Sequence, residues 1–203
     1  MRLIAIVLTA LLLGACSSKT TPPPAANSGP TLDCAKPANS AQQLVCGDLV
    51  LRDLDNRVAD GYQRALDRTG ADKSALTDAQ NKWAAERDAC SQNADVPLCV
   101  REAYQTRLVQ LAMSDPATAI PPVVTFRCPA EDSPLTAQFF NQFEPPAAVL
   151  EWKGKQHILF AQPSGSGSRY GRQGIEYWEH QGEVRLDFTG IPGGTKFVCK
   201  TPS

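Results

Sequence analysis

Through the first half of the chain, hydrophobic positions recur at the spacing of an α-helix. Residues three or four positions apart form series that are mostly apolar or aromatic. Such spacing places the members of a series on one face of a helix. The pattern predicts three amphipathic helices, with Thr77-Asp78 capping the middle one and Asp95 to Pro97 starting the last. The series are Leu51, Leu54, Val58, Tyr62 and Leu66; Leu76, Gln80, Trp83, Arg87 and Cys90; and Val100, Tyr104, Leu108 and Leu111.

The second half of the chain has the shorter alternation of β-strands. Runs of β-branched and aromatic residues are separated by turn sequences such as Lys153–Lys155 and Gln181-Gly182. Repeated antiparallel hairpins of this length favour a small barrel or sandwich, because closing a barrel leaves no exposed strand edge. The predicted fold class is therefore α+β. The expected strands are residues 123–127, 135–140, 147–152, 157–161, 175–178, 184–188 and 196–199.

The N-terminal segment and two changes of composition divide the chain. The apolar run from Leu3 to Leu13 is too short to cross a bilayer as a helix and fits the hydrophobic part of a secretory signal. A Ser-, Thr- and Pro-rich stretch indicates a tether, and a second Pro-rich stretch indicates a linker. The predicted organisation is a signal peptide at 1–15, a lipid-anchored tether at 16–30, a helical domain at 31–114, a linker at 115–122 and a β-domain at 123–203.

The end of the apolar run carries a processing motif. The sequence from Leu13 to Cys16 resembles a bacterial lipobox, which implies cleavage before Cys16 and acylation of its sulfur and new amino terminus. Acyl chains contribute about 0.8 kcal/mol per buried CH₂, so several chains anchor a protein firmly. Ser17, not Asp, follows Cys16, and this implies an exported lipoprotein of the outer membrane that faces the periplasm of a Gram-negative bacterium. The alternative is an ordinary signal peptide with an incidental cysteine.

Six further cysteines lie in the two expected domains. In an exported protein oxidation is the default, and small cores gain from disulfides. Cys128 and Cys199 would close a loop of about 70 residues, worth on the order of 4 kcal/mol in the chain-entropy treatment. The helical domain holds four cysteines, which allow three pairings. Pairing neighbours in sequence is favoured, because each bridge would close a short loop at a helix end. These pairs are Cys34–Cys46 and Cys90–Cys99.

Composition excludes several function classes. Lys and Arg number 20 against 21 Asp and Glu, giving a formal net charge of -1 without a basic concentration, so no nucleic-acid surface is expected. His157 and His180 are the two histidines, and Cys-x-x-Cys, P-loop and Gly-x-Ser-x-Gly motifs are missing. We therefore expect no metal, cofactor, small-molecule substrate or enzymatic activity. We interpret His157 as a satisfied or exposed strand residue, and Glu176, Glu179 and Glu183 as solvated strand positions.

The helical half carries a spaced set of cysteines, aromatic residues and charged residues: Asp33-Cys34, Cys46, Leu54-Asp55, Tyr62, Gln80, Trp83, Arg87-Asp88, Cys90, Cys99, Tyr104, Arg107 and Leu111. This set resembles the LprI-type N-terminal domain of lysozyme inhibitors, over about 34–111. The resemblance is strong for fold and weak for function. The same residues also suit helix packing, with Trp83 and Tyr104 in the core and Arg87 and Arg107 paired with nearby acids.

The β-domain carries a second set of short motifs: Phe126–Cys128, Pro134–Thr136, Ser164–Tyr170, Gly174–Trp178 and Cys199-Lys200. This set resembles the membrane-bound inhibitor of c-type lysozyme over nearly all of 123–200. That resemblance implies an eight-stranded antiparallel barrel whose Ser-Gly loop enters the lysozyme cleft. It assigns the loop serine to Ser166 and places His180 where the family usually has a lysine. The Gly-Asp that follows this lysine in the family is also altered, which puts the charge partner in question.

Elementary chemistry supports a role for the loop that begins at Ser164. A lysozyme cleft holds one protonated and one ionised carboxyl group, and a serine hydroxyl can both donate and accept. Gly165 and Gly167 would let the backbone enter a narrow groove, and Tyr170 could pack the loop base. From composition alone, the same segment could equally be a flexible hairpin loop.

These observations predict a lipid-anchored periplasmic inhibitor of c-type lysozyme that occludes the catalytic cleft. Its expected partners are lysozyme and, through Cys16, a membrane. The alternative is a structural envelope lipoprotein whose helical domain binds a periplasmic or cell-wall partner. A peptidoglycan-cleaving enzyme is a weaker third hypothesis, because the sequence offers no defensible acid-base pair.

Overall fold

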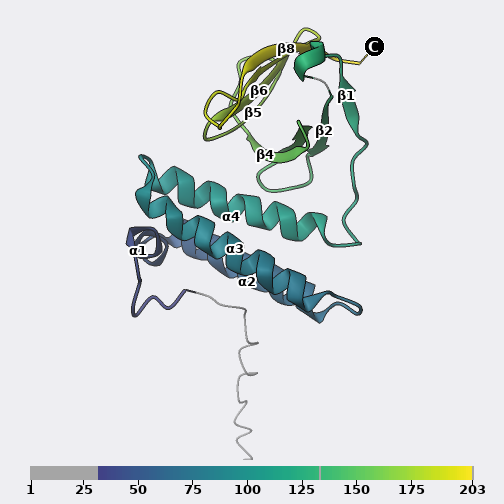
Figure 1. The fold of residues 1–203 in the computed structure, drawn as a ribbon. Helices are drawn as coiled ribbons and strands as arrows, with labels where there is room; N and C mark the ends of the chain where they lie inside the picture. Colours follow the sequence, from purple (N-terminus) through teal and green to yellow (C-terminus); the bar gives the residue numbers. More distant parts are fainter. Residues whose placement is uncertain (1–31, 133, 203) are drawn as a thin grey trace, which may run out of the picture.

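The computed structural model describes residues 32–132 and 134–202. Helices come first and an antiparallel sheet follows, which confirms the α+β prediction (Figure 1). Among the described residues, no helix has the length and apolar character needed to cross a membrane. The helices are α1 (Ser40–Gly47), α2 (Leu49–Asp67), α3 (Lys73–Ala89), η1 (Cys90–Gln92), α4 (Val96–Met113) and η2 (Ala130–Asp132). The strands are β1 (Val124–Phe126), β2 (Leu135–Phe140), β3 (Ala147–Trp152), β4 (Lys155–Ala161), β5 (Ser168–Arg172), β6 (Ile175–His180), β7 (Glu183–Asp187) and β8 (Lys196–Lys200).

Side-chain caps set where the helices begin. Asp95 caps α4 as predicted, accepting from the N–H of Leu98 at 3.0 Å. The predicted cap at Thr77-Asp78 is wrong, because Asp72 caps α3 one turn earlier. The Thr77 hydroxyl instead donates to a main-chain carbonyl within the first turn of α3. Helix α1 was not predicted, since its eight residues are too few for a clear periodicity.

The helical core contains the predicted aromatic pair, Trp83 and Tyr104, whose rings meet edge to face at 5.2 Å. Arg87 pairs with Asp88 at 2.9 Å and lies 4.0 Å from Asp55, as the packing interpretation expected of it. These buried groups satisfy one another, because the Tyr104 hydroxyl donates to Asp55 at 2.8 Å. The helical half is therefore held by an aromatic core with an internal ion pair.

Arg107 departs from the expectation of an acidic partner. Its Nε donates to the amide oxygen of Gln80 at 2.9 Å, and it forms no ion pair with any described residue. Burial lowers the pKa of Arg107. The neutral amide of Gln80 takes the place expected for a carboxylate but satisfies the guanidinium only in part, because the Nη2 of Arg107 is buried without a hydrogen-bond partner among the described residues.

Two disulfides lie at helix ends within the helical region. Cys34–Cys46 ties the segment before α1 to the end of that helix, and Cys90–Cys99 joins η1 to the first turn of α4. This is the local pairing that the cysteine spacing favoured. Each bridge joins residues close in sequence, so it restrains a helix end and not the whole region.

The eight strands pair in sequence order, each antiparallel to the next. Two main-chain hydrogen bonds between Arg127 and Lys200, of 3.0 and 2.9 Å, bring the last strand back to the first. The Cys128–Cys199 disulfide lies beside this seam. The sheet is thus a nearly closed barrel, and it contains one strand, β5, that was not among the expected runs. Its residues are Ser-Arg-Tyr-Gly-Arg, with too little alternation to reveal a strand.

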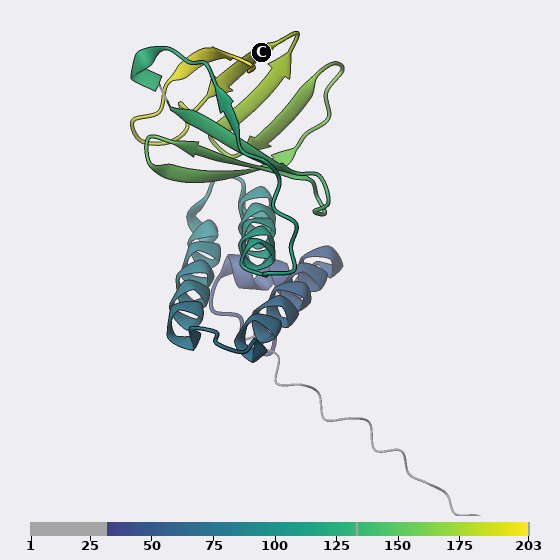
Figure 2. The same cartoon turned by 90° about the vertical axis from the view of Figure 1, so that its right-hand side faces the viewer.

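The barrel and the helices share an apolar contact. Val109 of α4 packs against the outer face of β2, β3 and β4, where α4 lies next to the barrel in Figures 1 and 2. Residues 147–150 of β3 are all buried, because one face looks into the barrel and the other meets α4. The α-helices end at Met113, and the strands begin at Val124. The division of the chain into separately folding domains stays a prediction. The barrel residues in this contact are Phe140, Ala147, Val149, Ile158 and Phe160.

Candidate functional site

The Ser-Gly loop, residues 164–167, connects β4 to β5 and is exposed throughout. The Ser164 hydroxyl donates to the carbonyl oxygen of Ser166 at 2.6 Å, and the same hydroxyl oxygen accepts from the N–H of Ser166 at 3.4 Å. The Ser166 hydroxyl forms no hydrogen bond with the described residues. The loop therefore has an internal turn that leaves one hydroxyl group free for a partner.

The two glycines of the loop have different structural roles. Gly167 has φ +69°, and a Cβ there would lie 1.9 Å from the carbonyl oxygen of Glu179. Any larger residue would push the loop away from β6. A Cβ on Gly165 would meet no atom within 4 Å. Gly167 is thus required by the fold of the free protein, whereas a need for Gly165 would have to come from a partner.

Trp178 of β6 contacts the loop directly, although it was not predicted as a site residue. Its indole Nε1 donates to the carbonyl oxygen of Ser166 at 3.1 Å. The ring stacks on His180, with centroids 5.8 Å apart and planes at 19°, and Arg185 lies 5.4 Å from the ring centroid. The available signal was alternation, because Trp178 follows the buried Tyr177 and so is placed on the outer face of its strand.

His180 lines a hollow of about 300 Å³ on this outer face. Across the strands, it is in register with Glu183, whose carboxylate pairs with Lys200 at 2.8 Å. Neither His180 nor Arg185 forms an ion pair with a described residue. The structure therefore brings His180 to the loop through Trp178 and places the guanidinium of Arg185 close to the same indole ring.

Tyr170 lies inside the barrel. Its ring is 5.5 Å from that of Phe139 and 5.9 Å from that of Tyr177, and its hydroxyl donates to Asn141 at 3.4 Å. Burial raises the pKa of Tyr170, and the nearby carboxylate of Glu179 raises it further. Tyr170 is positioned to pack the base of the loop rather than to present its ring to solvent.

Two of the three acidic strand residues form ion pairs at the surface. Glu176 is held by Arg169 at 2.7 Å and Glu183 by Lys200, and both pairs are exposed. Such contacts suit solvated strand positions. Glu179 differs, since it is half-buried and close enough to raise the pKa of Tyr170. Within the ranges 32–132 and 134–202, no group of three or more His, Cys, Asp and Glu residues could hold a metal ion.

His157 does not fit the expectation of a satisfied or exposed residue. Its ring meets that of Phe188 at 5.2 Å, and its Nε2 is buried without a hydrogen-bond partner among the described residues. Burial lowers the pKa of His157, and the charge of Arg172 lowers it further. This residue lies apart from the Ser-Gly loop and has a packing role in the barrel.

Comparison with known proteins covers both halves of the chain. Residues 126–191, which include the Ser-Gly loop and His180, match the family described as membrane-bound lysozyme-inhibitor of c-type lysozyme. Two relatives named Lipoprotein LprI, from Mycobacterium bovis and Mycobacterium tuberculosis, are each 58% identical over 205 residues, covering 99% of this chain and 100% of the relative. The chain belongs to the LprI lipoprotein family. No solved structure gives a significant match.

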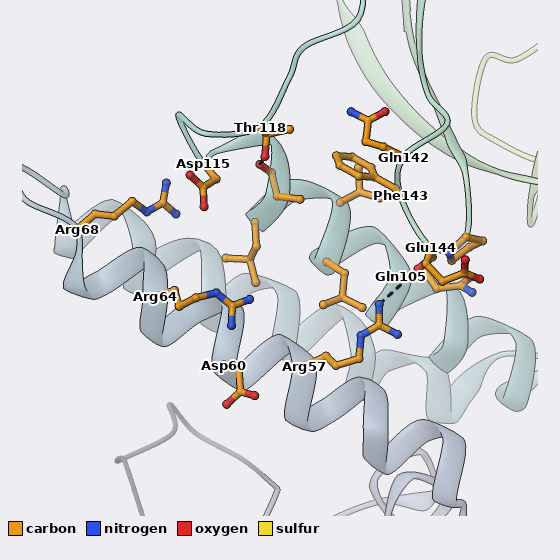
Figure 3. Close-up of a pocket in the computed structure, with 16 residues that line it drawn as sticks. Arg57, Asp60, Arg64, Arg68, Gln105, Asp115, Thr118, Gln142, Phe143 and Glu144 are labelled. Carbon is orange, nitrogen blue, oxygen red and sulfur yellow. Dashed lines mark hydrogen bonds between the residues drawn. The ribbon is translucent and has the colours of Figure 1, made fainter.

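In this LprI-family chain a second hollow, of about 450 Å³, lies between α2, α4 and the β2–β3 turn (Figure 3). Two arginines of α2 and a third, directly after the end of that helix, line it together with Asp60. Arg57 donates to the carbonyl oxygen of Glu144 at 3.4 Å, and Arg68 donates to that of Ser114. These contacts join α2 to the β2–β3 turn and to the end of α4. None of the residues of the Ser-Gly loop takes part. The three arginines are Arg57, Arg64 and Arg68.

Proposed function

We propose that this protein inhibits c-type lysozyme by inserting the Ser-Gly loop into the catalytic cleft. The observation that carries the proposal is the free, exposed hydroxyl of Ser166 on a loop tied to the barrel at Gly167 and Trp178. The family match at 126–191 and the lipoprotein relatives support lysozyme inhibition in general. The geometry of the loop supports this particular mode of inhibition.

The proposed contact matches the chemistry of the target. A c-type lysozyme cleft contains a protonated general acid and an ionised carboxylate. The Ser166 hydroxyl can donate to the ionised group and accept from the protonated one. Because the internal turn through Ser164 already orders the loop, less conformational entropy is lost on binding. Ser164, Gly165 and Gly167 would then shape the inserted segment, and Tyr170 would support it from within the barrel.

A turbidity assay of lysozyme on bacterial cell walls tests this function. The soluble chain 17–203 should inhibit, and Ser166→Ala should weaken inhibition roughly tenfold or more, because loss of a hydrogen bond to a carboxylate costs on the order of 1–3 kcal/mol. Ser168→Ala is the matched control, since Ser168 is also exposed but begins β5. Equal inhibition by both variants would overturn the loop assignment.

Two other outcomes would replace the proposed function. Failure of the wild-type chain to bind or inhibit lysozyme would favour the structural envelope lipoprotein. Clearing of cell walls without added lysozyme would favour a peptidoglycan-cleaving enzyme.

We also propose that the protein is held in the cell envelope by acylation of Cys16, which lies outside the described residues. The lipobox resemblance and the lipoprotein relatives support this anchor. Cys16→Ser should move the protein from the membrane fraction to the soluble fraction and remove the mass of the lipid. The anchor would be contradicted if the variant stayed in the membrane fraction and the wild type carried no lipid mass. Placement in a Gram-negative outer membrane stays a prediction that the mycobacterial relatives do not support.

A further inference from the structure

The carbonyl oxygen of Ser166 accepts hydrogen bonds from two different side chains. One comes from the Ser164 hydroxyl within the loop, at 2.6 Å, and the other from the indole Nε1 of Trp178 on β6, at 3.1 Å. A carbonyl oxygen has two lone pairs, so both acceptor positions are occupied. Because the Ser166 side chain is attached to the Cα next to this carbonyl, holding the peptide limits the directions in which the hydroxyl can point.

The indole that donates the second bond is itself restrained. The imidazole of His180 stacks on it at 5.8 Å, and the guanidinium of Arg185 lies 5.4 Å from the ring centroid. Arg185 is directly across from Trp178 in the β6–β7 register. Contacts between an aromatic face and a planar cation are favourable and restrict the side chain. The indole N–H is thereby aimed at the loop before any partner binds.

The backbone of the loop is also restrained at the residue that follows Ser166. Gly167 lies so close to the carbonyl oxygen of Glu179 that no Cβ would fit. The loop is therefore fastened to the same strand, β6, at two points, by a side-chain hydrogen bond from Trp178 and by a close main-chain approach next to it. Loss of the bond from Trp178 would leave the residues before Gly167 less restrained.

We propose that Trp178 is a positioning residue that holds the Ser-Gly loop ready for binding, through its N–H bond to Ser166. This inference rests on the proposed function, in which the loop enters the lysozyme cleft. Trp178 acts through Ser166 and need not touch the enzyme. Its contribution is to reduce the ordering of the loop that binding would otherwise require.

Trp178→Phe in the soluble chain 17–203 isolates the hydrogen bond, because phenylalanine keeps an aromatic ring between His180 and Arg185 but has no N–H. The variant should bind lysozyme about 5- to 10-fold more weakly by calorimetry, as expected for one hydrogen bond. A double-mutant cycle with Ser166→Ala separates positioning from direct contact. In the Ser166→Ala background, Trp178→Phe should have much less effect. Full additivity of the two changes would overturn the proposal.

A second measurement does not depend on lysozyme. Backbone ¹⁵N relaxation of residues 165–167 should show a rigid loop in the wild type and lower order parameters in Trp178→Phe, with the barrel amides unchanged. Order parameters that are equal in the two proteins would overturn the positioning role. Should wild-type protein fail to bind lysozyme while Trp178→Phe still loosens the loop, the proposed function would fall and the fastening of the loop by Trp178 would be supported.

Discussion

Glu102 of α4 accepts a hydrogen bond from the backbone N–H of Gln173, at 3.1 Å, across the boundary between the helices and the barrel. Gln173 lies in the turn between β5 and β6. Strand β5 directly follows the Ser-Gly loop, and β6 carries Trp178. Glu102 is buried, and burial raises the pKa of its carboxyl group against the opposing effects of this hydrogen bond and of Arg172. The contact thus links the helical region to the sheet that presents the loop.

Glu102→Gln should stabilise the protein at neutral pH. A carboxyl group whose pKa is raised on folding contributes stability that is fully present below its unfolded pKa, about 4.3, and is lost as pH rises through the folded-state value. Glutamine keeps an acceptor for Gln173 without the buried charge. The free energy of unfolding of the variant should exceed that of the wild type by a few tenths to about 1 kcal/mol at pH 7 and should equal it near pH 4. Urea unfolding at both values measures this, and a less stable variant at pH 7 would contradict it.

Val109→Asp should disrupt the contact between α4 and the barrel. It places a carboxylate in an apolar cluster in which Val109 is 4% exposed. An unpaired buried charge costs on the order of 3–5 kcal/mol, so urea unfolding should begin at much lower denaturant. Gln110→Asp, at an exposed position on the same helix, is the control. Similar stability of the two variants would mean that this packing adds little.

The same contact alters what an isolated barrel should do. Residues 123–203 alone would expose the apolar outer face that α4 covers, including Phe140, Val149 and Phe160. Large exposed apolar patches promote aggregation. We expect this fragment to be less soluble than the chain 17–203, as judged by size-exclusion chromatography. Recovery of a soluble, folded and inhibitory monomer would show that the helices are dispensable for the barrel.

Removal of Cys128–Cys199 should destabilise the protein more than removal of Cys34–Cys46. The bridged residues are 71 positions apart in the first pair and 12 in the second. Chain entropy assigns about 4 kcal/mol to the longer loop and about 3 kcal/mol to the shorter one. Double Cys→Ala variants, unfolded in urea under oxidising conditions, give the two values. The reverse order would indicate that local strain or residual structure outweighs loop entropy.

His180→Lys tests whether His180 supplies the charge that the family lysine would carry. Lysine stays positively charged from pH 5 to 8, whereas imidazole is the type of side chain whose charge ordinarily changes within this range. The lysine variant should therefore inhibit better than the wild type at pH 8, and its advantage should shrink towards pH 5. Because lysozyme's own general acid titrates near pH 6, both proteins must be compared in identical buffers.

Parallel inhibition curves from pH 5 to 8 would exclude His180 as the charge contact. Arg185 would then be the next candidate, because it forms no ion pair with a described residue and lies beside Trp178. Arg169 is less suitable, since Glu176 already neutralises it. In that case Arg185→Gln should weaken the inhibition of lysozyme.

Local signals in the sequence determined much of this protein. Periodicity identified the faces of α2, α3 and α4, because an amphipathic helix must bury one side wherever it packs. Asp95 before Pro97 marked the start of α4, since both residue types favour the first turn. Cysteines close in sequence favoured the pairing that the structure contains. The loop residues 164–167 were also recognisable from sequence, through a family resemblance.

Only the tertiary structure decided which surfaces meet. Periodicity reveals that a side chain is buried but not what covers it, so the packing of Val109 on the barrel could not be predicted. Strand β5 has little hydrophobic pattern of its own and is ordered by the main-chain bonds that β4 and β6 offer on either side. The bond from Trp178 to Ser166 joins residues 12 apart, because the pairing of β5 with β6 brings the end of the loop next to Trp178. Such contacts depend on where strands lie in space, which local sequence patterns do not encode.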